Sequence, residues 1–518
     1  MSSTTLVDAL GLCFGTAVLA LGCLRWLRVA QREHYLAGTT VRFARRWWLA
    51  TGVNRALAVA GAAGALASLW YPPAGFAALV VAGGAPIGLK LRGTTSPLAW
   101  TPRLRRLAGT SALLAGLVVG LVAVAGLHAA FSAVTICALG APVLIDAALT
   151  LLKPVEARLL RPYVDRASQR LRAVAPRVVA ITGSYGKTTT KGYVAHLVAG
   201  SRSVVATPAS FNNTAGLARA INEHLATGTQ VFVAEMGTYG AGEIAAMCAW
   251  TRPEVAVITA IGPVHLERMG SLERIAEAKA EILDKASVAI LNVDHPLLAQ
   301  LAQKVEEEGK TVWRCSSQEP RGDVTVTAEA GGLRVRAAHV GAEMDLLVPA
   351  GPEVEPGNVA CAVAVALALG VPTGTVAGRL GSLPGAPHRR SAQRGANGAR
   401  IIDDTYNANP AGAKAALALL GVIGDPAGKR VVVTPGMVEL GRLQDRENAN
   451  FAAGTGTVAT ELVVVGRTNA RSLMAGAKAA GVPVHRARDR KAAVGWVSAH
   501  LRAVDAVLYE NDLPDHYP

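Results

Sequence analysis

Five long apolar stretches precede residue 153, and they constrain this part of the chain more than any other sequence feature. A helix needs about 20 apolar residues to cross a bilayer, and in lipid its backbone groups must be paired internally. The sequence therefore predicts a transmembrane region of about five helices over residues 1–152. They are expected at roughly 6–24, 56–71, 74–91, 107–127 and 129–152. The second and third are short, so either the two form a tight hairpin or one of them is an interfacial helix.

Basic residues follow alternate stretches. They cluster after the first, third and fifth, whereas the loops after the second and fourth carry no Lys or Arg. Because positively charged loops stay in the cytoplasm, the N-terminus is expected outside and everything after residue 153 inside. This predicts a multi-pass protein of the cytoplasmic (inner) membrane. The alternative, a cleaved signal peptide followed by soluble helices, fits poorly because residues 1–8 lack a basic segment.

The formal net charge of +15 is concentrated in this apolar part. Residues 1–177 hold 19 Lys/Arg against 5 Asp/Glu, and residues 178–518 hold 33 against 32. The nearly neutral remainder argues against a nucleic-acid partner, while the basic loops suit anionic membrane lipid. Residues 153–177 are predicted to form a basic juxtamembrane connector interrupted by Pro154 and Pro162. None of the six cysteines forms a CxxC pair, which fits a reducing cytoplasm.

A glycine loop follows the apolar run 178–182 and precedes a helical pattern. Strand, glycine loop and helix form the context of a phosphate loop, in which backbone N–H groups and a helix dipole face phosphate oxygens. Lys187 is expected to reach the terminal phosphates of ATP, and Thr188 to coordinate Mg²⁺. The spacing is the short TGxxGKT form, because Ile181 stands where the longer pattern has glycine. The predicted nucleotide-binding residues are Gly183, Ser184, Tyr185, Gly186, Lys187, Thr188 and Thr189.

Six further motifs follow in order. They are FNNTAG at 211–216, AEMG at 234–237, IGPVHLE at 261–267 with Gly270-Ser271, AKAEI at 278–282, PHR at 387–389 and DDTYNANP at 403–410. With TGSYGKTTTK, this set resembles the Mur ligase family, the ATP-dependent amide-forming enzymes of peptidoglycan precursor synthesis. The resemblance spans about residues 178–510, and its last motif is most similar to the branch that adds D-alanyl-D-alanine.

The resemblance implies two Mg²⁺ sites that serve catalysis together with Lys187. Thr188 and Glu235 would hold one Mg²⁺, and His265 with a carbamylated Lys279 would hold the second. A carbamate converts a cation into an oxygen ligand, which suits a hard metal ion. Without the motifs, other interpretations stay open: Glu235 as a helix cap, His265 as a structural histidine and Lys279 as a solvated helix residue.

The resemblance also assigns residues that contact ATP. Asp404 would bind the ribose, Arg389 and Asn409 would contact ATP or order the domain closure, and Asn213 lies behind the phosphate loop. Arg390 adjoins Arg389, so the sequence leaves open which of the two points inward. Phe211 and Tyr406 are as readily packing residues as ligand contacts.

The spacing of apolar runs predicts two α/β domains after the membrane region. In residues 178–383, strands near 231–234, 255–261 and 288–292 alternate with helices, which indicates the parallel sheet of a P-loop central ATP-binding domain. It includes a β excursion at 322–350 and a helix at 358–370. Residues 384–518, with strands near 401–402, 430–434, 462–465 and 506–509, indicate a Rossmann-like C-terminal domain. ATP would lie between the two domains.

Two departures from the family concern substrates. Soluble Mur ligases begin with a domain that binds the UDP end of the precursor, and membrane helices take its place here, so the acceptor is expected to be lipid-linked or otherwise held at the membrane. The acidic C-terminal segment 510–518 stands where the D-alanyl-D-alanine branch has a basic glycine segment, which leaves the incoming amine open.

The expected function is a membrane-anchored, ATP- and Mg²⁺-dependent amide ligase that acts through an acyl-phosphate. It would add an amino acid or dipeptide to a carboxylate of a cell-envelope precursor, with membrane lipid and other envelope-synthesis proteins as partners. Two alternatives are a polyglutamate-type amide polymerase for capsule, and a membrane scaffold or transporter with a regulatory nucleotide-binding domain. The second metal site at His265 and Lys279 argues against the scaffold, because a nucleotide switch does not need it.

Overall fold

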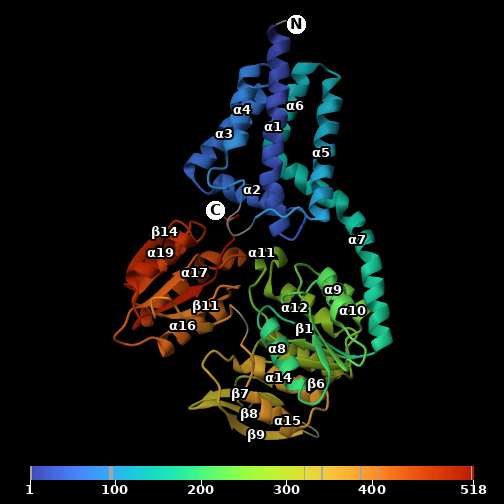
Figure 1. Cartoon of the computed structure of the whole chain (residues 1–518), viewed down its shortest axis with the longest axis vertical. Helices are drawn as coiled ribbons and strands as arrows, with labels where there is room; N and C mark the ends of the chain where they lie inside the picture. Colours follow the sequence, from blue (N-terminus) through green and yellow to red (C-terminus); the bar gives the residue numbers. More distant parts are fainter. Residues whose placement is uncertain are drawn as a thin grey trace. The chain divides into compact units, whose positions relative to one another are not determined.

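The computed structural model describes residues 3–92, 97–319, 321–339, 342–385, 388–406, 408–514 and 516–517. The chain forms two compact units (Figure 1). One comprises Met1–Leu159 together with Leu513–Pro518, and the other comprises Leu160–Asp512. Each unit has its own hydrophobic core.

The N-terminal unit is a bundle of helices in which α1 packs against α4, α5 and α6. Its helices are α1 (Ser3–Arg32), α2 (Thr39–Leu49), α3 (Gly52–Ala67), α4 (Pro72–Gly84), α5 (Pro102–Ala123), α6 (Leu127–Leu139) and the first part of α7 (Ala141–Val174). Among the described residues, two helices are long and apolar enough to cross a membrane, Thr5–Arg32 and Pro102–Ala123. Two bent pairs, α2 with α3 and α6 with α7, raise this number to four if each pair is one span.

The expected five spans therefore differ from the helices observed. The first and fourth predicted stretches coincide with the long helices α1 and α5. The second and third form α3 and α4, of 16 and 13 residues, which pack on each other as a hairpin. At about 1.5 Å per residue, neither is long enough to cross a bilayer alone.

Helix α7 runs unbroken through the connector that the sequence predicted to be interrupted. It includes both Pro154 and Pro162. A proline in a helix removes one backbone hydrogen bond and crowds the preceding turn, but the flanking turns can continue the helix. Near the start of α7, Asp146 accepts hydrogen bonds from the backbone N–H groups of Thr40 and Val41 at the first turn of α2, which gives this buried acid a structural role.

The last residues of the chain belong to the N-terminal unit. His516 is buried, and its Nε2 lies 3.0 Å from Oε1 of Glu33. The Trp47 indole N–H donates to the His516 carbonyl at 2.9 Å. The Tyr517 ring packs edge-on against Phe43 at 4.9 Å between centroids. This end of the acidic segment that departs from the family pattern therefore packs on the helical bundle.

The second unit begins with a nine-stranded sheet in the order β2-β3-β1-β4-β5-β6-β7-β8-β9. Strands β1 to β7 pair in parallel, and β8 and β9 are antiparallel. One face is covered by α8 (Lys187–Val198), α14 (Pro356–Ala368) and α15 (Thr373–Leu380). The other is covered by the end of α7 and by α9 (Thr214–His224), α10 (Glu243–Thr251), α12 (Leu272–Ala280) and α13 (Pro296–Glu307). The strands are β1 (Arg177–Thr182), β2 (Val204–Ala206), β3 (Val231–Glu235), β4 (Val255–Ile258), β5 (Val288–Asn292), β6 (Thr311–Ser316), β7 (Val324–Glu329), β8 (Gly332–His339) and β9 (Ala342–Val348).

A six-stranded sheet follows, in the order β10-β11-β15-β12-β13-β14. Only β10 is antiparallel, which is the Rossmann-like arrangement expected for this region. Its strands are β10 (Ser391–Arg394), β11 (Arg400–Asp404), β12 (Arg430–Thr434), β13 (Glu461–Val465), β14 (Val484–Ala487) and β15 (Ala506–Glu510). Helices α16 (Pro410–Ile423), α17 (Gln444–Gly454) and α18 (Ala470–Ala479) cover one face, and α19 (Arg490–His500) covers the other. Of the short strands, β2, β6, β10 and β14 were not predicted.

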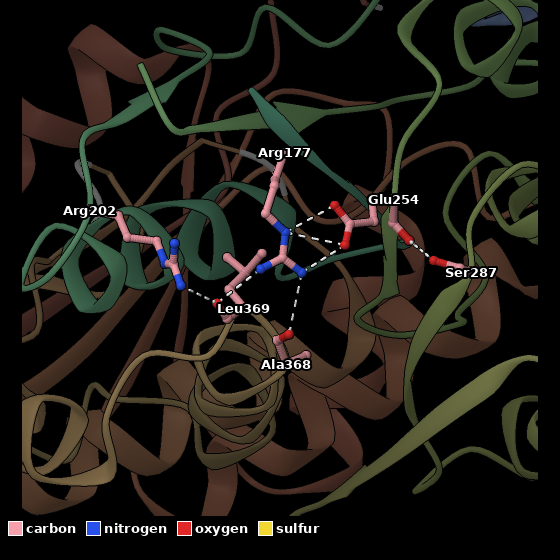
Figure 2. Close-up of polar contacts among 6 residues, drawn as sticks. All are labelled: Arg177, Arg202, Glu254, Ser287, Ala368 and Leu369. Atoms are coloured by element: carbon pink, nitrogen blue, oxygen red, sulfur yellow. Dashed lines mark hydrogen bonds and ion pairs between the residues drawn. The ribbon is translucent and has the colours of Figure 1, made fainter. Parts of the chain in front are cut away.

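Arg177 links the amino ends of β1 and β4. Its guanidinium donates to both carboxylate oxygens of Glu254 and to the carbonyl of Leu369, just past α14 (Figure 2). Arg202 donates to the same carbonyl at 2.8 Å. The polar groups at this edge are paired with one another, which leaves the opposite, carboxyl edge as the place for a ligand.

Candidate active site

The predicted phosphate loop lies at the carboxyl end of β1, and two of its glycines are required by its shape. Gly183 and Gly186 have φ angles of +154° and +84°. A Cβ on Gly183 would lie 2.0 Å from the Thr259 hydroxyl, and one on Gly186 would lie 2.2 Å from Oδ1 of Asn358. The loop therefore turns tightly into α8, with backbone N–H groups of its first turn unpaired within the helix.

The side chains of Ser184 and Tyr185 fasten this loop to the segment that follows β4. The Ser184 hydroxyl donates to the Gly262 carbonyl at 3.1 Å and accepts from the Gly262 N–H at 2.9 Å. The Tyr185 hydroxyl donates to the Ile261 carbonyl at 3.2 Å. These two side chains therefore hold the shape of the loop. Thr189 is half-buried in the first turn of α8.

Lys187 and Thr188 begin α8 and lie beside Glu235, the last residue of β3. The Lys187 ammonium donates to the Gly183 carbonyl at 2.6 Å, and the Thr188 hydroxyl donates to Oε2 of Glu235 at 3.0 Å. Burial lowers the pKa of Lys187 to about 8; the charge of Glu235 opposes this shift, and that of Arg389 adds to it. At this site the positive charge of the buried Lys187 ammonium is destabilised until an anion binds beside it.

Glu235 is almost fully buried and has two further partners. Asn212 donates to its Oε1 at 3.1 Å, and the Lys191 ammonium lies 3.0 Å from its Oε2. Both were missed from sequence, although Lys191 sits one helical turn after Thr188 and so faces the same way. Asn213, which was predicted to bind the cofactor, accepts a hydrogen bond from the Gly216 N–H and caps α9.

The donors around Glu235 fit a magnesium ion. A buried carboxylate and a hydroxyl are oxygen ligands, and Mg²⁺ in nucleotide sites takes one or two such ligands and completes its shell with phosphates and water. No cluster of three or more His, Cys, Asp or Glu side chains suited to a metal occurs among the described residues. Any Mg²⁺ at Thr188 and Glu235 would therefore need phosphate oxygens from the nucleotide.

Lys279 lies in α12 and is buried, so it is not a solvated helix residue. Burial lowers its pKa well below the ordinary value, and the charge of Lys187 lowers it further. The two lysines are thus close enough to interact electrostatically. A lowered pKa favours the neutral amine, and the neutral amine is the form that adds CO₂.

His265 contacts a glutamate of the C-terminal domain. Its Nδ1 hydrogen-bonds to Oε2 of Glu439, while Arg268 donates to Oε1 of the same carboxylate at 2.9 Å. Burial alone would raise the pKa of Glu439, but the hydrogen bonds and charges of His265 and Arg268 outweigh it and lower the pKa to about 2. Glu439 was missed from sequence, because it lies 174 residues from His265.

Arg389, and not Arg390, reaches the phosphate loop. Its guanidinium donates to the Thr188 hydroxyl at 3.4 Å and lies over the Tyr406 ring at 4.4 Å. Arg390 turns toward Glu355, at 3.3 Å. The choice that the sequence left open is therefore resolved in this structure. Tyr406 packs under Arg389 and hydrogen-bonds to Ser210.

The remaining predicted contacts lie at the carboxyl end of the six-stranded sheet. Asp404 ends β11 and accepts from the Arg390 N–H at 3.2 Å, and burial raises its pKa to about 6. Asn409 caps α16 by accepting from Gly412 at 2.9 Å. Pro387 and Asn407, which belong to the predicted motifs, lie outside the described residues.

Glu510, at the end of β15, adds an acid that sequence reasoning did not place in the site. It is fully buried, and its Oε2 accepts from the Thr434 hydroxyl at 2.7 Å. Its Oε1 has no hydrogen-bond partner among the described residues. Burial raises the pKa of this carboxyl to about 8.

Comparison with known proteins gives one consistent result. Residues 181–366 match the Mur ligase middle domain, and residues 388–509 match the Mur ligase, glutamate ligase domain. The chain is 32% identical over 364 residues to the UDP-N-acetylmuramoyl-tripeptide–D-alanyl-D-alanine ligase of Mycobacterium leprae strain TN, covering 64% of this chain and 70% of the relative. It is 32% identical over 309 residues to the enzyme of the same name from Bacillus subtilis strain 168, covering 59% and 63%. Among solved structures, the MurF ligase from Thermotoga maritima in complex with ADP shares its fold, with a TM-score of 0.58 and 24% identity, covering 68% of this chain and 80% of that one.

Proposed function

This chain belongs to the Mur ligase family of ATP-dependent, ADP-forming ligases, and from that premise we propose that it is a membrane-anchored amide ligase for a cell-envelope precursor. The relatives are named for joining D-alanyl-D-alanine to a UDP-N-acetylmuramoyl tripeptide. We assign the same type of bond to this chain. It joins the amine of an amino acid or dipeptide to a carboxylate of a peptidoglycan-type precursor.

Amide formation from a carboxylate requires a leaving group, and ATP supplies it. A carboxylate oxygen of the acceptor attacks the γ-phosphorus, the bond between that phosphorus and the β–γ bridging oxygen breaks, and its electrons leave with ADP. The product is an acyl phosphate. The incoming amine nitrogen then attacks the acyl carbon, the carbon–oxygen bond to phosphate breaks, and inorganic phosphate and one proton are released.

The residues at the phosphate loop suit the first of these steps. Backbone N–H groups of the loop and the N-terminus of α8 hold the nucleotide phosphates. Lys187 gains a phosphate partner that keeps its ammonium protonated, which places a positive charge where negative charge develops. Arg389 brings a second cation from the C-terminal domain to the same hydroxyl that Glu235 holds, that of Thr188.

Two magnesium sites complete the proposal. Thr188 and Glu235 would hold one ion, and His265 with a carbamylated Lys279 would hold the other. Magnesium supplies positive charge at the phosphates and orients the transferred group. The burial of Lys279 and the charge of Lys187, which both lower its pKa, support carbamylation, because a carbamate would gain the Lys187 cation as a partner in place of like-charge repulsion.

The observation that carries this function is the meeting of Lys187, Thr188, Glu235 and Arg389 at one edge of one sheet. The test is release of phosphate from ATP by purified full-length protein in detergent, with candidate amines and carboxylates added together. We expect phosphate release that requires both an amine and a carboxylate. If no pair stimulates turnover, and Lys187→Ala leaves the cellular phenotype unchanged, the ligase assignment fails.

A membrane location is the second part of the proposal. Helix α5 presents an apolar face that the protein does not cover: Leu113, Leu117 and Leu121 are 60% to 77% exposed. A run of exposed leucines at helical spacing suits lipid better than water. Together with the basic loops, this supports a multi-pass anchor with the N-terminus outside, catalytic domains in the cytoplasm, and an acceptor held at the membrane.

Two measurements test this location and the acceptor. Protein that stays in the membrane pellet through alkaline carbonate washing and dissolves only in detergent supports the anchor, and release by carbonate contradicts it. Mass spectrometry of envelope precursors after depletion of the protein names the acceptor, since the unligated precursor accumulates. Accumulation of a soluble UDP-linked species would overturn the lipid-linked acceptor while leaving the ligase chemistry intact.

A further inference from the structure

One loop of the C-terminal domain forms several hydrogen bonds with the turn that carries His265. Glu439 lies between β12 and the short helix η2 (Gly441–Leu443). One oxygen of its carboxylate hydrogen-bonds to Nδ1 of His265, and the other accepts from the Arg268 guanidinium. Its backbone carbonyl accepts from the Glu267 N–H at 3.2 Å. Three attachments within residues 265–268 make this a specific junction between the two domains.

The backbone on both sides of this junction is in an unusual conformation. His265 and Glu439 have φ angles of 61° and 63°, in the left-handed region that side chains other than glycine rarely adopt. Such conformations are strained and persist where surrounding contacts hold them. Gly441, with φ +56°, comes so near that an added Cβ would lie 3.3 Å from the Glu267 nitrogen.

The His265 ring is held from a second direction by Tyr239. The two rings meet edge to face at 4.9 Å, and the Arg268 guanidinium lies over the Tyr239 ring at 5.0 Å. The Nδ1 atom is therefore occupied by its hydrogen bond to Glu439, and the imidazole ring packs against Tyr239. Nε2 makes no hydrogen bond in the part of the chain that the structure describes.

We propose that Glu439 is a positioning residue of the ligase reaction, supplied by the C-terminal domain to orient His265. A carboxylate on Nδ1 holds the proton there, fixes the ring and leaves Nε2 as the ligand atom. The inference rests on the proposed function, in which His265 serves a metal site, and adds a residue that acts only while the C-terminal domain is docked.

This arrangement couples catalysis to the position of a domain. The C-terminal domain reaches the middle domain's site at two points, through Arg389 on Thr188 and through Glu439 on His265. If the domain moves away, His265 loses its orienting carboxylate at the same time as Thr188 loses Arg389. The site is then assembled only in the docked arrangement, which limits ATP hydrolysis without substrates.

The test is a double-mutant cycle in full-length protein in detergent. Glu439→Gln is expected to lower kcat of amine-dependent phosphate release about 10- to 100-fold with little change in KM for ATP. Because Glu439 acts through His265, the variant carrying both Glu439→Gln and His265→Ala should be no slower than His265→Ala alone. Hydrogen exchange in nucleotide-free protein gives an independent measure, since the amide of Glu267 should exchange faster in Glu439→Gln.

Glu461→Gln is the matched control, because Glu461 is also an ion-paired glutamate of this domain but lies at the opposite edge of its sheet. It should leave both kcat and the exchange of Glu267 unchanged. Glu439→Asp, which keeps the charge but shortens the side chain, replaces Glu439→Gln if that variant does not fold, with the same non-additivity expected. Multiplicative losses in the double variant, or unchanged exchange at Glu267, would overturn the positioning role. Loss of the proposed function itself is seen separately, as wild-type turnover that Lys187→Ala does not reduce.

Discussion

The amino and carboxyl edges of the central sheet differ in how far their charged groups are buried. At the amino edge, Arg177 and Glu254 are each about one-third exposed, at 34% and 38%, and form a bidentate pair (Figure 2). At the carboxyl edge, Glu235 is buried and Lys187 and Lys279 have lowered pKa values. Paired, hydrated charges stabilise a fold modestly, whereas buried charges are destabilising unless a ligand partner compensates. The difference separates the edge that holds the sheet together from the edge to which we assign the chemistry.

The six-stranded sheet repeats this polarity. Lys429 and Glu461 form an exposed pair at 2.8 Å at the amino ends of β12 and β13. At the carboxyl ends of β11 and β15, burial raises the pKa of Asp404 to about 6 and of Glu510 to about 8. Both α/β domains thus place ionisable groups with shifted pKa values at the strand ends where ligands of such folds bind.

The largest expected effect is the loss of activity in Lys187→Ala. Removing a preorganised cation from a buried phosphoryl-transfer site should lower kcat of phosphate release by about 10³-fold. The variant should not melt earlier than the wild type, because the removed ammonium was desolvated in the free protein. Arg177→Gln, at the other edge, should keep turnover within a few-fold of the wild type. Equal loss of activity in the two variants would remove the distinction between the edges.

Lys279 provides the next largest effect and tests what chemical form the buried amine takes. Lys279→Gln should lower kcat by about 10²-fold, since it removes a proposed metal ligand and cannot add CO₂. Because burial lowers its pKa and so favours the neutral amine, ¹³CO₂-equilibrated protein should show a carbamate carbon resonance, and acidification should remove it. The resonance should be absent in Lys279→Gln. Its persistence in that variant would place the carbamate on another lysine.

Sequence could predict the carboxyl edge of the central sheet because its signals are local. The loop at Gly183–Thr188 follows from the strand, glycine and helix pattern. Glu235 was assigned from the resemblance of the AEMG segment to the family, and the structure places Glu235 beside Thr188. Glu439 and Asn212 could not be predicted in the same way. Their roles come from contacts across domains or between strand ends, which no periodicity along the chain reports.

Elsewhere the local signals were insufficient for a different reason. Hydropathy predicted five spans, but α3 and α4 are short and two helix pairs bend by 115° and 78°, which composition does not encode. Pro154 and Pro162 were expected to interrupt α7, yet the helix runs unbroken through both. Asn213 and Asn409, which the family motifs assign to cofactor contacts, both make helix caps, a role that Asn often adopts where a helix begins.

Glu510 should have a smaller effect, seen in stability and not in turnover. Its pKa is about 8 in the folded state, above the ordinary 4.5, so the folded protein binds a proton that the unfolded chain has lost between these values. The free energy of unfolding therefore falls as pH rises through this window. Glu510→Gln should remove that slope and stabilise the protein at pH 8 by on the order of 2 kcal/mol. Thermal unfolding at pH 5 and pH 8, with Glu461→Gln as the control, measures the difference, and an unchanged slope contradicts the burial argument.

The smallest expected effect is at the amino edge itself. Arg177→Gln should lower the free energy of unfolding by about 1 kcal/mol, because a partly exposed ion pair contributes little. Arg177 also donates to the Leu369 carbonyl, and carbonyls at a helix end lack partners within the helix. This bond should bring the loss of unfolding free energy to the upper end of what a partly exposed ion pair contributes. A double-mutant cycle with Glu254→Gln in denaturant should give a coupling of about 0.5–1 kcal/mol, with the KM for ATP unchanged. A coupling several-fold larger, or weaker ATP binding in either variant, would mean that this edge also takes part in positioning the phosphate loop, and the two edges would no longer differ in kind.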